Sequence, residues 1–431
     1  MTAQIAVMNK EAVALASDSA VTMREKRGQK MFSSANKLFT LSKYEPVGIM
    51  AYGTADFMGV PWESIVKMYR AELARQRFET LGGYAEHFIA FLNDGNPLFP
   101  ESEQRNNVYR TAARFYNRVK EALFKRVKAT VERRAQVKEA EIFDVASRVI
   151  EGYHSWLQQC ADLPTLPAGH LGNVLNKYGD VIDRARENIF QELPLSDLSQ
   201  RQLRETAAAL FCKDAHIRRV SRMSGVVIAG FGENDFFPMI RSFWVDSVAD
   251  NKLKYKVKRV PEISFDNPAA VIPFAQAEMV HTFMEGIDPS LYRFTHDFLS
   301  AAFDKHSEGT LQLLDKYDDK EKDKLREKLK HESGKLLEDY RRQMQSRKGA
   351  SFIGPIVDVV AMLPKDELAA MAESLVSLTS FKRRVTMEEE TVAGPIDVAV
   401  ISKGDGLIWI KRKHYFKSEL NAQFFANYYR R

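Results

Sequence analysis

The chain has 431 residues, of which 45% are hydrophobic and 28% are charged. At about 100–200 residues per domain, this length allows two or three domains or one domain with large insertions, and the hydrophobic fraction excludes wholesale disorder. The net charge of +6 is too small to indicate nucleic-acid binding by itself, and no apolar stretch approaches the roughly 20 residues that a membrane-spanning helix needs.

The chain opens with two short apolar segments that are typical of β-strands. Residues 3–8 and residues 12–16 are compact and apolar, and the polar residues 9–11 between them predict a tight turn. We therefore expect an N-terminal β-hairpin.

Two further strands are expected after a polar stretch. Residues 23–30 (MREKRGQK) predict a loop. Strand-like runs follow at residues 37–41 and 47–52, and Gly53 bounds the second of them.

From residue 61 the apolar period changes from two residues to nearly four. This change predicts helices as far as about residue 216. Ser199 and the three residues after it precede an apolar-periodic run and predict a helix start. Breaks are expected at residues 82–83, 93–100 and 163–172, and near Pro194.

Strands and helices alternate once more before the chain ends. Strand character returns at residues 225–229 and 240–245, and residues 274–381 are expected to be helical with a break at residues 349–355. The last two strands are expected at residues 396–401 and 406–410.

Strand pairs thus open, bisect and close the chain, with helical blocks between them. This order predicts an α+β fold, built as one layered domain with two long helical insertions. An isolated helical insertion cannot bury its apolar stripe alone, so we expect the helices to pack on one another or on a neighbour.

Basic residues gather between Arg105 and Lys138, where they outnumber the acidic ones. The simpler interpretation is a solvated helix face. The alternative is a face that docks nucleic acid or an acidic partner, although nucleic acid is not the favoured partner.

The cysteines and the candidate metal ligands are few. Cys160 and Cys212 could form one disulfide at most, and the N-terminus lacks the pattern of a secretory signal, so we expect reduced thiols and a cytoplasmic protein. Two pairs have a spacing of four residues, Cys212 with His216 and His281 with Glu285, but no further ligand follows at metal-site spacing. Neither a metal nor a cofactor is predicted.

Thr2 is the most informative position for chemistry. Removal of the initiator Met is favoured before a small residue and would leave a threonine with a free α-amino group. Such a residue carries a nucleophilic hydroxyl and a base of unperturbed pKa about 7.7–8 together. The alternative is an ordinary chain terminus, since many proteins begin with Met-Thr.

Asp18 follows the second expected strand, and Lys37 begins the third. A lysine ammonium beside Thr2 would favour the unprotonated amine and a developing alkoxide, and a carboxylate would hold the lysine in place. The alternative is a solvated aspartate and an exposed lysine, which would contribute little.

Several segments, taken in order, resemble the proteasome β-subunits and the peptidase of the bacterial proteasome-like heat-shock protease. The N-terminal stretch TAQIAVMNKEAVALASDSAVT resembles the mature N-terminus of these proteins. The later segments that match are residues 36–39 (NKLF), 50–56 (MAYGTAD), 225–230 (GVVIAG), 394–400 (GPIDVAV) and 403–406 (KGDG).

The resemblance implies the four-layer αββα sandwich of N-terminal-nucleophile hydrolases. Residues 2–60, 223–285 and 365–412 would form the sandwich. Residues 61–222 and 286–364 would be helical insertions on the outer layers, and residues 413–431 would form a C-terminal tail.

The resemblance also implies roles for five residues. Thr2 would be the nucleophile, with its own amine as base, and Lys37 its electrostatic partner. Asp18 would orient the lysine. The backbone N–H at or next to Tyr52 would stabilise the oxyanion, and Glu389, or alternatively Glu390, would be the acid that supports these residues without contacting the substrate.

Three positions depart from the family pattern. Tyr52 stands where the family places a glycine, and Gln276 and Val392 fall near positions where the family has serines. A bulky side chain at Tyr52 could reshape or block the cleft, and two supporting hydroxyls are missing.

These observations lead to three hypotheses about function. The first is a threonine hydrolase that cleaves peptide or other amide bonds in a peptide or protein substrate through an acyl-enzyme on Thr2. The second is a catalytically inactive scaffold or ring subunit, motivated by the departures. The third makes the basic helical insertion a docking site. The resemblance further implies a homo-oligomer, possibly a ring, and leaves an unfolding ATPase partner open; no membrane association is expected.

Overall fold

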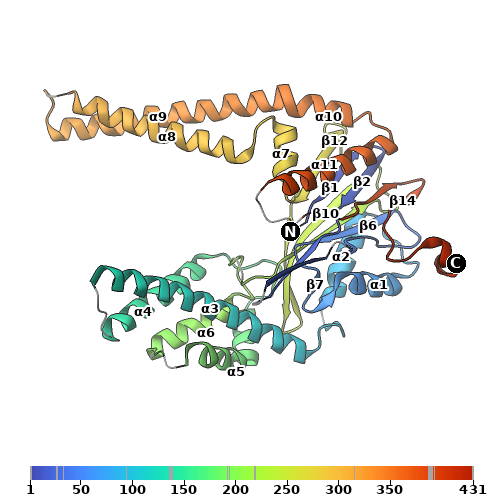
Figure 1. Cartoon of the computed structure of the whole chain (residues 1–431), viewed down its shortest axis with the longest axis horizontal. Coiled ribbons are helices and arrows are strands. Elements are labelled where there is room, and N and C mark those ends of the chain that lie inside the picture. The colour runs from blue at the N-terminus through green and yellow to red at the C-terminus, as the bar shows by residue number, and fades with distance from the viewer. Residues whose placement is uncertain are drawn as a thin grey trace. The chain divides into compact units, whose positions relative to one another are not determined.

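The computed structural model of the chain describes residues 2–25, 28–32, 34–93, 95–134, 139–191, 193, 195–217, 220–314, 316–386, 392 and 394–429. Its helices and antiparallel sheets confirm the predicted α+β class. The chain forms two units (Figure 1), the first made of Met1–Ala35 and Pro261–Arg431 and the second of Asn36–Val260. The expected division into one sandwich and two insertions draws on both units and stays a prediction.

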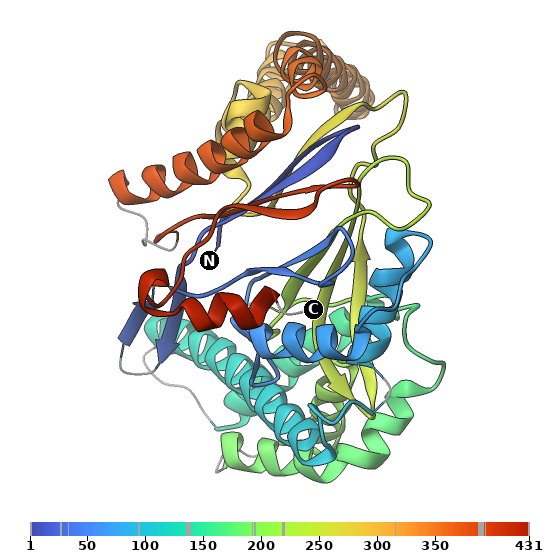
Figure 2. The ribbon, with the colours of Figure 1, turned by 90° about the vertical axis from the view of Figure 1, so that its right-hand side faces the viewer.

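The first unit contains a five-stranded antiparallel sheet in the order β12-β1-β2-β13-β14 (Figure 2), which joins segments from both ends of the sequence. The predicted strand pairs at the two ends of the chain are therefore confirmed. The strands are β1 (Gln4–Asn9), β2 (Ala12–Ser17), β12 (Ala269–Ala275), β13 (Asp397–Ser402) and β14 (Gly406–Lys411).

Asn9 explains why the first hairpin turns where it does. Its Oδ1 accepts hydrogen bonds from the backbone N–H groups of Glu11 (2.9 Å) and Ala12 (3.2 Å). Its Nδ2 donates to the carbonyls of Val360 (3.1 Å) and Leu363 (2.9 Å) at the end of helix α10 (Gly354–Val360). One side chain therefore closes the turn and anchors it to a helix.

Small residues on one face of this sheet allow helix α11 (Lys365–Val385) to pack closely against it. The alternate residues Ala12, Ala14 and Ala16 of β2 lie in one hydrophobic cluster with buried residues of α11. The period of two along the strand brings these alanines to the same face. The helix buries Leu368, Ala369, Ala372, Leu375 and Val376.

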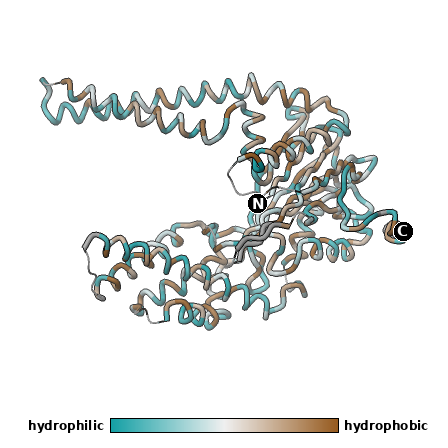
Figure 3. The backbone as a smooth tube through the Cα atoms, in the orientation of Figure 1, coloured by the Kyte–Doolittle hydropathy of each residue, from teal (hydrophilic) through white to brown (hydrophobic). Residues whose placement is uncertain are grey.

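Two long helices of the first unit, α8 (Pro289–Gln312) and α9 (Asp319–Lys348), form an antiparallel hairpin. Figure 3 shows hydrophilic residues recurring along both of them. The expected break at residues 349–355 is wrong: a π-helical segment, η1 (Gly349–Ile353), continues directly into α10. Helix α7 (Glu278–Glu285) precedes α8 in the chain.

The loop expected at residues 23–30 is also wrong. Strands β3 (Val21–Glu25) and β4 (Gly28–Phe32) pair there as an antiparallel hairpin. Only Val21 and Met23 alternate with polar residues here, which is too short a run to predict a strand. The first unit ends with a 3-10 turn, η2 (Ser418–Leu420), and helix α12 (Ala422–Tyr429).

The second unit contains another five-stranded antiparallel sheet, in the order β11-β10-β9-β6-β5. The strands expected at residues 37–41, 47–52, 225–229 and 240–245 all belong to it. Its strands are β5 (Leu38–Thr40), β6 (Val47–Tyr52), β9 (Ser224–Gly230), β10 (Met239–Ala249) and β11 (Lys252–Lys258).

Helices α1 (Trp62–Leu73) and α2 (Leu81–Leu92) share a hydrophobic cluster with this second sheet. Tyr69 and Phe88 meet edge to face within the cluster, with ring centroids 4.9 Å apart. A small hairpin, β7 (Asp56–Phe57) with β8 (Val60–Pro61), leads into α1.

Four further helices of the second unit build a separate hydrophobic core, as expected for a helical insertion. The buried Tyr116 hydroxyl donates to the carbonyl of Leu203 (3.3 Å), and Tyr178 receives a hydrogen bond from the backbone N–H of Asp250 (3.0 Å). Both phenols are thus satisfied inside the core. The helices are α3 (Glu101–Arg134), α4 (Glu139–Gln159), α5 (His170–Phe190) and α6 (Asp197–Ala209).

Two helix boundaries differ from the sequence prediction. Gly82 and Gly83 do not break a helix but lie in the first turn of α2, which Thr80 caps. Helix α6 begins at Asp197 and is capped by Ser196, whose Oγ accepts from the N–H of Ser199 (3.1 Å). A helix tolerates glycine in its first turn, and of two nearby serines only the one with extended backbone can cap. Pro194 lies outside the described residues.

Strands β11 and β12 were also missed by the sequence analysis. Strand β11 alternates lysine with apolar residues, which is a strand pattern typical of a sheet edge. Strand β12 extends to Ala275, where a helix was expected from residue 274. Its Pro273 is compatible with a strand because β12 lies at the edge of its sheet.

None of the described helices is long and apolar enough to cross a membrane. Cys160 and Cys212 are both free thiols in the structure.

Candidate active site

A buried carboxylate organises the N-terminal end of the first sheet. Asp18 is 1% exposed and directly follows β2. Its Oδ1 accepts the N–H of Ala3 (3.1 Å) and its Oδ2 accepts the N–H of Ala20 (3.1 Å). Its own backbone N–H donates to the carbonyl of Ala3 (3.1 Å). Asp18 therefore holds both backbone polar groups of the residue after Thr2.

Thr2 lies directly at this clamp and is 5% exposed. The structure thus places the predicted nucleophile and the predicted acid next to each other at the end of β1 and β2. The two hydrogen bonds between Ala3 and Asp18 therefore fix the backbone directly after Thr2.

A row of polar side chains crosses the sheet beside Asp18. Gln4, Ser17 and Asp397 are paired in register on β1, β2 and β13. The Gln4 Nε2 donates to Ser17 Oγ (3.1 Å), and Ser17 Oγ donates to the carbonyl of Asp18 (3.1 Å). Polar residues in a buried row need such partners, and these bonds tie the row to the clamp.

The sequence analysis missed an ion pair in this row. Asp397 is 2% exposed; its Oδ1 accepts the backbone N–H of Lys413 (2.9 Å), and its Oδ2 pairs with the Lys413 ammonium. Ser19 Oγ donates to the carbonyl of Pro395, which precedes the same strand. The position of Asp397 within the apolar run IDVAVI indicated that its charge needs a cationic partner, but nothing in the sequence identified Lys413 as that partner.

Lys37 and Tyr52 belong to the second unit. Lys37 is 6% exposed and directly precedes β5, and its carbonyl accepts the backbone N–H of Ala51 (2.9 Å). The expectation of an exposed lysine, which was the alternative interpretation, is therefore wrong. Burial of a lysine is rare unless its charge is compensated.

The Tyr52 ring lies across a glycine of the neighbouring strand. Tyr52, Gly225 and Trp244 are paired in register on β6, β9 and β10. A Cβ added to Gly225 would lie 1.9 Å from Tyr52 Cζ, and the Tyr52 and Trp244 rings meet edge to face with centroids 5.1 Å apart. Tyr52 replaces the glycine that the resemblance predicts at this position, and Gly225 on the neighbouring strand leaves room for its phenol ring.

The backbone changes direction immediately after Tyr52. Gly53 has φ +98°, which L side chains rarely adopt, and a Cβ there would lie 2.6 Å from the carbonyl oxygen of Met223. This turn ends β6 at the position where the resemblance places the oxyanion-binding N–H.

We expect alanine at Gly225 to destabilise the second unit by about 1–3 kcal/mol, because the new methyl group displaces the Tyr52 ring. Gly152 in α4 is the matched control, since a Cβ there meets nothing within 4 Å. Thermal unfolding of the two variants should show a lower midpoint only for Gly225→Ala. Equal midpoints would contradict the packing described for Tyr52.

Burial raises the pKa of Tyr52 to about 12, and the nearby Ser242 side chain opposes this effect in part. The folded chain therefore holds this proton more tightly than the unfolded chain, where the pKa is about 10. Stabilisation from the neutral phenol should be fully present below pH 10 and be lost as the pH rises towards 12. The difference in tyrosinate absorbance between wild type and Tyr52→Phe measures this titration, and a difference complete at pH 10 would contradict it.

The remaining site predictions have mixed outcomes. Glu389 and its neighbour Glu390 lie outside the described residues. Gln276 occupies the turn between β12 and α7 with φ +46°, a left-handed conformation that favours glycine. Val392 is a core residue, and its carbonyl accepts a hydrogen bond from Ser380 Oγ (3.2 Å).

The two weak metal-ligand pairs do not form metal sites. Cys212 lies after α6, not within a helix, and burial raises its pKa to about 12, which disfavours the thiolate that binds metals. His281 pairs with Glu285 (3.1 Å), and Glu285 also binds the ammonium of Lys348 (2.8 Å). Across the described part of the chain, no group of three or more His, Cys, Asp or Glu residues could hold a metal ion.

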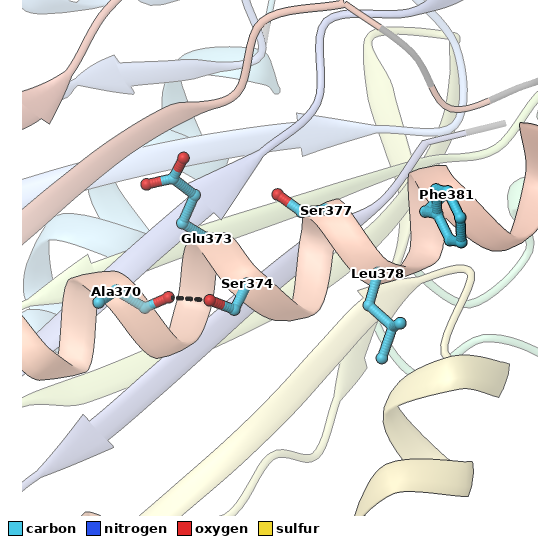
Figure 4. A pocket seen from close by; sticks show the side chains of 6 residues that line it. All are labelled: Ala370, Glu373, Ser374, Ser377, Leu378 and Phe381. Atoms are coloured by element: carbon cyan, nitrogen blue, oxygen red, sulfur yellow. Dashed lines mark hydrogen bonds between the residues drawn. The ribbon is translucent and has the colours of Figure 1, made fainter.

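A shallow groove on α11 contains none of the predicted site residues (Figure 4). Its lining comes from that single helix, where Ser374 Oγ donates to the carbonyl of Ala370 (2.7 Å) and Leu378 and Phe381 stand exposed. The groove offers little convergent polar chemistry, so the candidate active site remains the clamp at Asp18.

No protein-family model matches the chain, and none of the curated proteins is significantly similar to it in sequence.

Proposed function

We propose that the chain is a hydrolase that cleaves peptide or other amide bonds with Thr2 as its N-terminal nucleophile. The observation that carries this proposal is the buried carboxylate of Asp18, which accepts the N–H of Ala3 at 3.1 Å and so fixes the backbone of Thr2. A nucleophile must be held in line with its target within a fraction of an ångström, and a fixed terminus meets that need.

In the proposed reaction the α-amino group of Thr2 takes the hydroxyl proton as the oxygen attacks the carbonyl carbon of the amide. The C–N bond breaks, the amine leaves with that proton, and an ester joins Thr2 to the acyl group. Water then attacks the ester and restores the hydroxyl. Lys37 would stabilise the deprotonated oxygen and the neutral amine, and the N–H at or next to Tyr52 would donate to the oxyanion.

A four-layer αββα sandwich is part of the proposal. Each sheet packs its own helices on one face and carries apolar residues on the other. Such second faces require an apolar cover, and packing of the two sheets on each other would provide it. The residues of these faces are Ala6, Met8, Val13, Leu15 and Ile401 on the first sheet and Leu38, Met50, Val227 and Ala229 on the second.

Two conditions belong to the proposal. Whatever precedes Thr2 must be removed, because only a free α-amino group can act as the base. Substrate must also reach a residue that is 5% exposed in the full chain, so the processed protein must open at this end.

Intact mass together with a threonine-directed electrophile tests both conditions on the native full-length chain. We expect a mass that corresponds to a chain beginning at Thr2, and one probe molecule attached to the N-terminal peptide. A retained residue before Thr2, or a processed chain that the probe does not label, would overturn the proposal.

One observation favours the alternative of a catalytically inactive scaffold. The Tyr52 ring is fixed by Gly225 and Trp244 at the position where the related enzymes have a glycine. A processed, folded chain that stays unlabelled and self-associates would support this alternative.

The other predictions about partners remain proposals. They are a peptide or protein substrate, a homo-oligomer with an open ring size, and a cytoplasmic location; an unfolding ATPase partner is undecided. Size-exclusion chromatography with light scattering measures the oligomeric state directly.

A further inference from the structure

A polar cavity in the second unit lies between α3, the segment before β9, and β10. From α3 it is lined by Asn107, Thr111 and Arg114, which are spaced by four and three residues and therefore share one helix face. The cavity has an interior volume of about 10 Å³, which is close to the minimum that one water molecule needs.

The Arg114 side chain is held firmly at this cavity. Its Nε donates to the carbonyl of Val220 (2.9 Å), and its Nη2 donates to Thr111 Oγ1 (2.8 Å). Arg222 enters the lining from the other side. Two arginine side chains thus line a space that is large enough for one water-sized group.

The cations around the cavity outnumber the anions. Asp246 also lines it, but that carboxylate pairs with Lys254 (3.1 Å), which is 5% exposed. Neither Arg114 nor Arg222 has a carboxylate within 4.0 Å among the residues that the structure describes. Burial, and next to it the charge of Arg222, lowers the pKa of Arg114 to about 10, and the charge of Asp246 opposes this effect in part.

A buried donor completes the lining. Asn107 is 9% exposed, and its Nδ2 has no hydrogen-bond partner within the described chain. Buried side-chain donors are almost always satisfied, so this one calls for an acceptor. Strand β10 also bulges at Asp246, where its register with β11 shifts between Val245 and Ser247. Such bulges are over-represented next to binding sites.

We infer that one oxygen of an oxyanion group, a phosphate, sulfate or carboxylate, enters this cavity and accepts from Asn107 Nδ2, while the rest of the group lies at its mouth and Arg114 and Arg222 neutralise its charge. A water molecule would satisfy Asn107 but would leave the excess of positive charge in place. A cation is excluded by the same charges. Guanidinium groups prefer oxyanions because their planar N–H donors match the geometry of these groups.

Titration of the full-length protein with inorganic phosphate, sulfate or acetate at constant ionic strength tests the site. Calorimetry measures binding, and thermal unfolding measures the stabilisation that binding to the folded state alone must produce. We expect at least one of the three anions to bind in a one-to-one ratio and to raise the unfolding midpoint. Phosphate or sulfate binding alone indicates a tetrahedral anion, and acetate binding alone indicates a carboxylate.

Three variants locate the binding. Arg222→Gln should weaken the affinity at least tenfold, whereas Arg118→Gln on α3, where Arg118 faces Glu121 (3.6 Å), should leave it unchanged. Asn107→Asp has nearly the same shape and supplies its own carboxylate, so it should fold with an unchanged or raised midpoint and no longer respond to the anion. Arg114 is not substituted because its contacts also fix Val220 and Thr111.

The inference is overturned if no anion shifts the midpoint of the wild type. It is equally overturned if the Arg222 and Arg118 variants respond alike, or if Asn107→Asp keeps the full response. It does not depend on the chemistry proposed for Thr2.

Discussion

Replacing Thr2 with alanine should lower the rate of amide cleavage by at least about 10³-fold, because the variant lacks the oxygen that forms the acyl-enzyme. Thr2 lies outside the hydrophobic cluster of its unit, and the Ala3 and Asp18 contacts use backbone and carboxylate atoms that the substitution leaves in place. The free energy of unfolding should therefore fall by no more than about 1 kcal/mol.

Thr2→Ser is the matched control for this loss. It keeps the hydroxyl and the small second residue, so processing and covalent labelling should survive, with a lower rate because serine has more rotamer freedom at χ1. Intact mass must show that both variants are processed in the same way as the wild type. Equal cleavage by the wild type and a processed Thr2→Ala variant would contradict the assignment of the nucleophile.

Breaking the buried ion pair between Asp397 and Lys413 should have the largest effect on stability. Removal of one partner from such a pair costs about 3–5 kcal/mol, since it leaves an uncompensated charge away from water. Asp397→Ala and Lys413→Met should each show this loss. The double variant Asp397→Leu with Lys413→Met should recover most of it, because an apolar pair of similar volume needs no counter-charge.

Hydrogen exchange of the β13 amides is the appropriate measurement, since unfolding of a chain with two units need not be two-state. The exposed pair of Glu332 with Lys335 (2.8 Å) on α9 serves as the control, and its removal should change nothing measurable. If the β13 amides exchange as slowly in the single variants as in the wild type, the ion pair does not hold this strand beside Asp18.

Much of the second sheet and of the first hairpin follows from local pattern. Strand β6 (Val47–Tyr52) has the bounds that the sequence predicted, because a proline and a glycine delimit an apolar run. Strand β11 could have been predicted from its alternating lysines. By contrast, β3 and β4 have almost no apolar alternation, and their pairing depends on backbone hydrogen bonds that composition does not encode.

The candidate site divides in the same way. Thr2 and Asp18 were selected from residue type and from their places beside two predicted strands, and the hairpin register brings their backbones together. The Asp397–Lys413 pair could not have been selected, because its members lie far from Asp18 in sequence and reach it only through the pairing of β13 with β2.

The sequence by itself determined the α+β class, the order of the main strands and helical blocks, and the residues that we propose for amide hydrolysis. These properties follow from local periodicity and from side-chain chemistry, both of which can be read from residues that are close in the sequence. Only the tertiary structure decided that Tyr52 rests on Gly225, that Lys413 neutralises Asp397, and that Asn107 and two arginines share a cavity. Each of these contacts joins residues distant in sequence, and their energies depend on burial, which a local pattern does not specify.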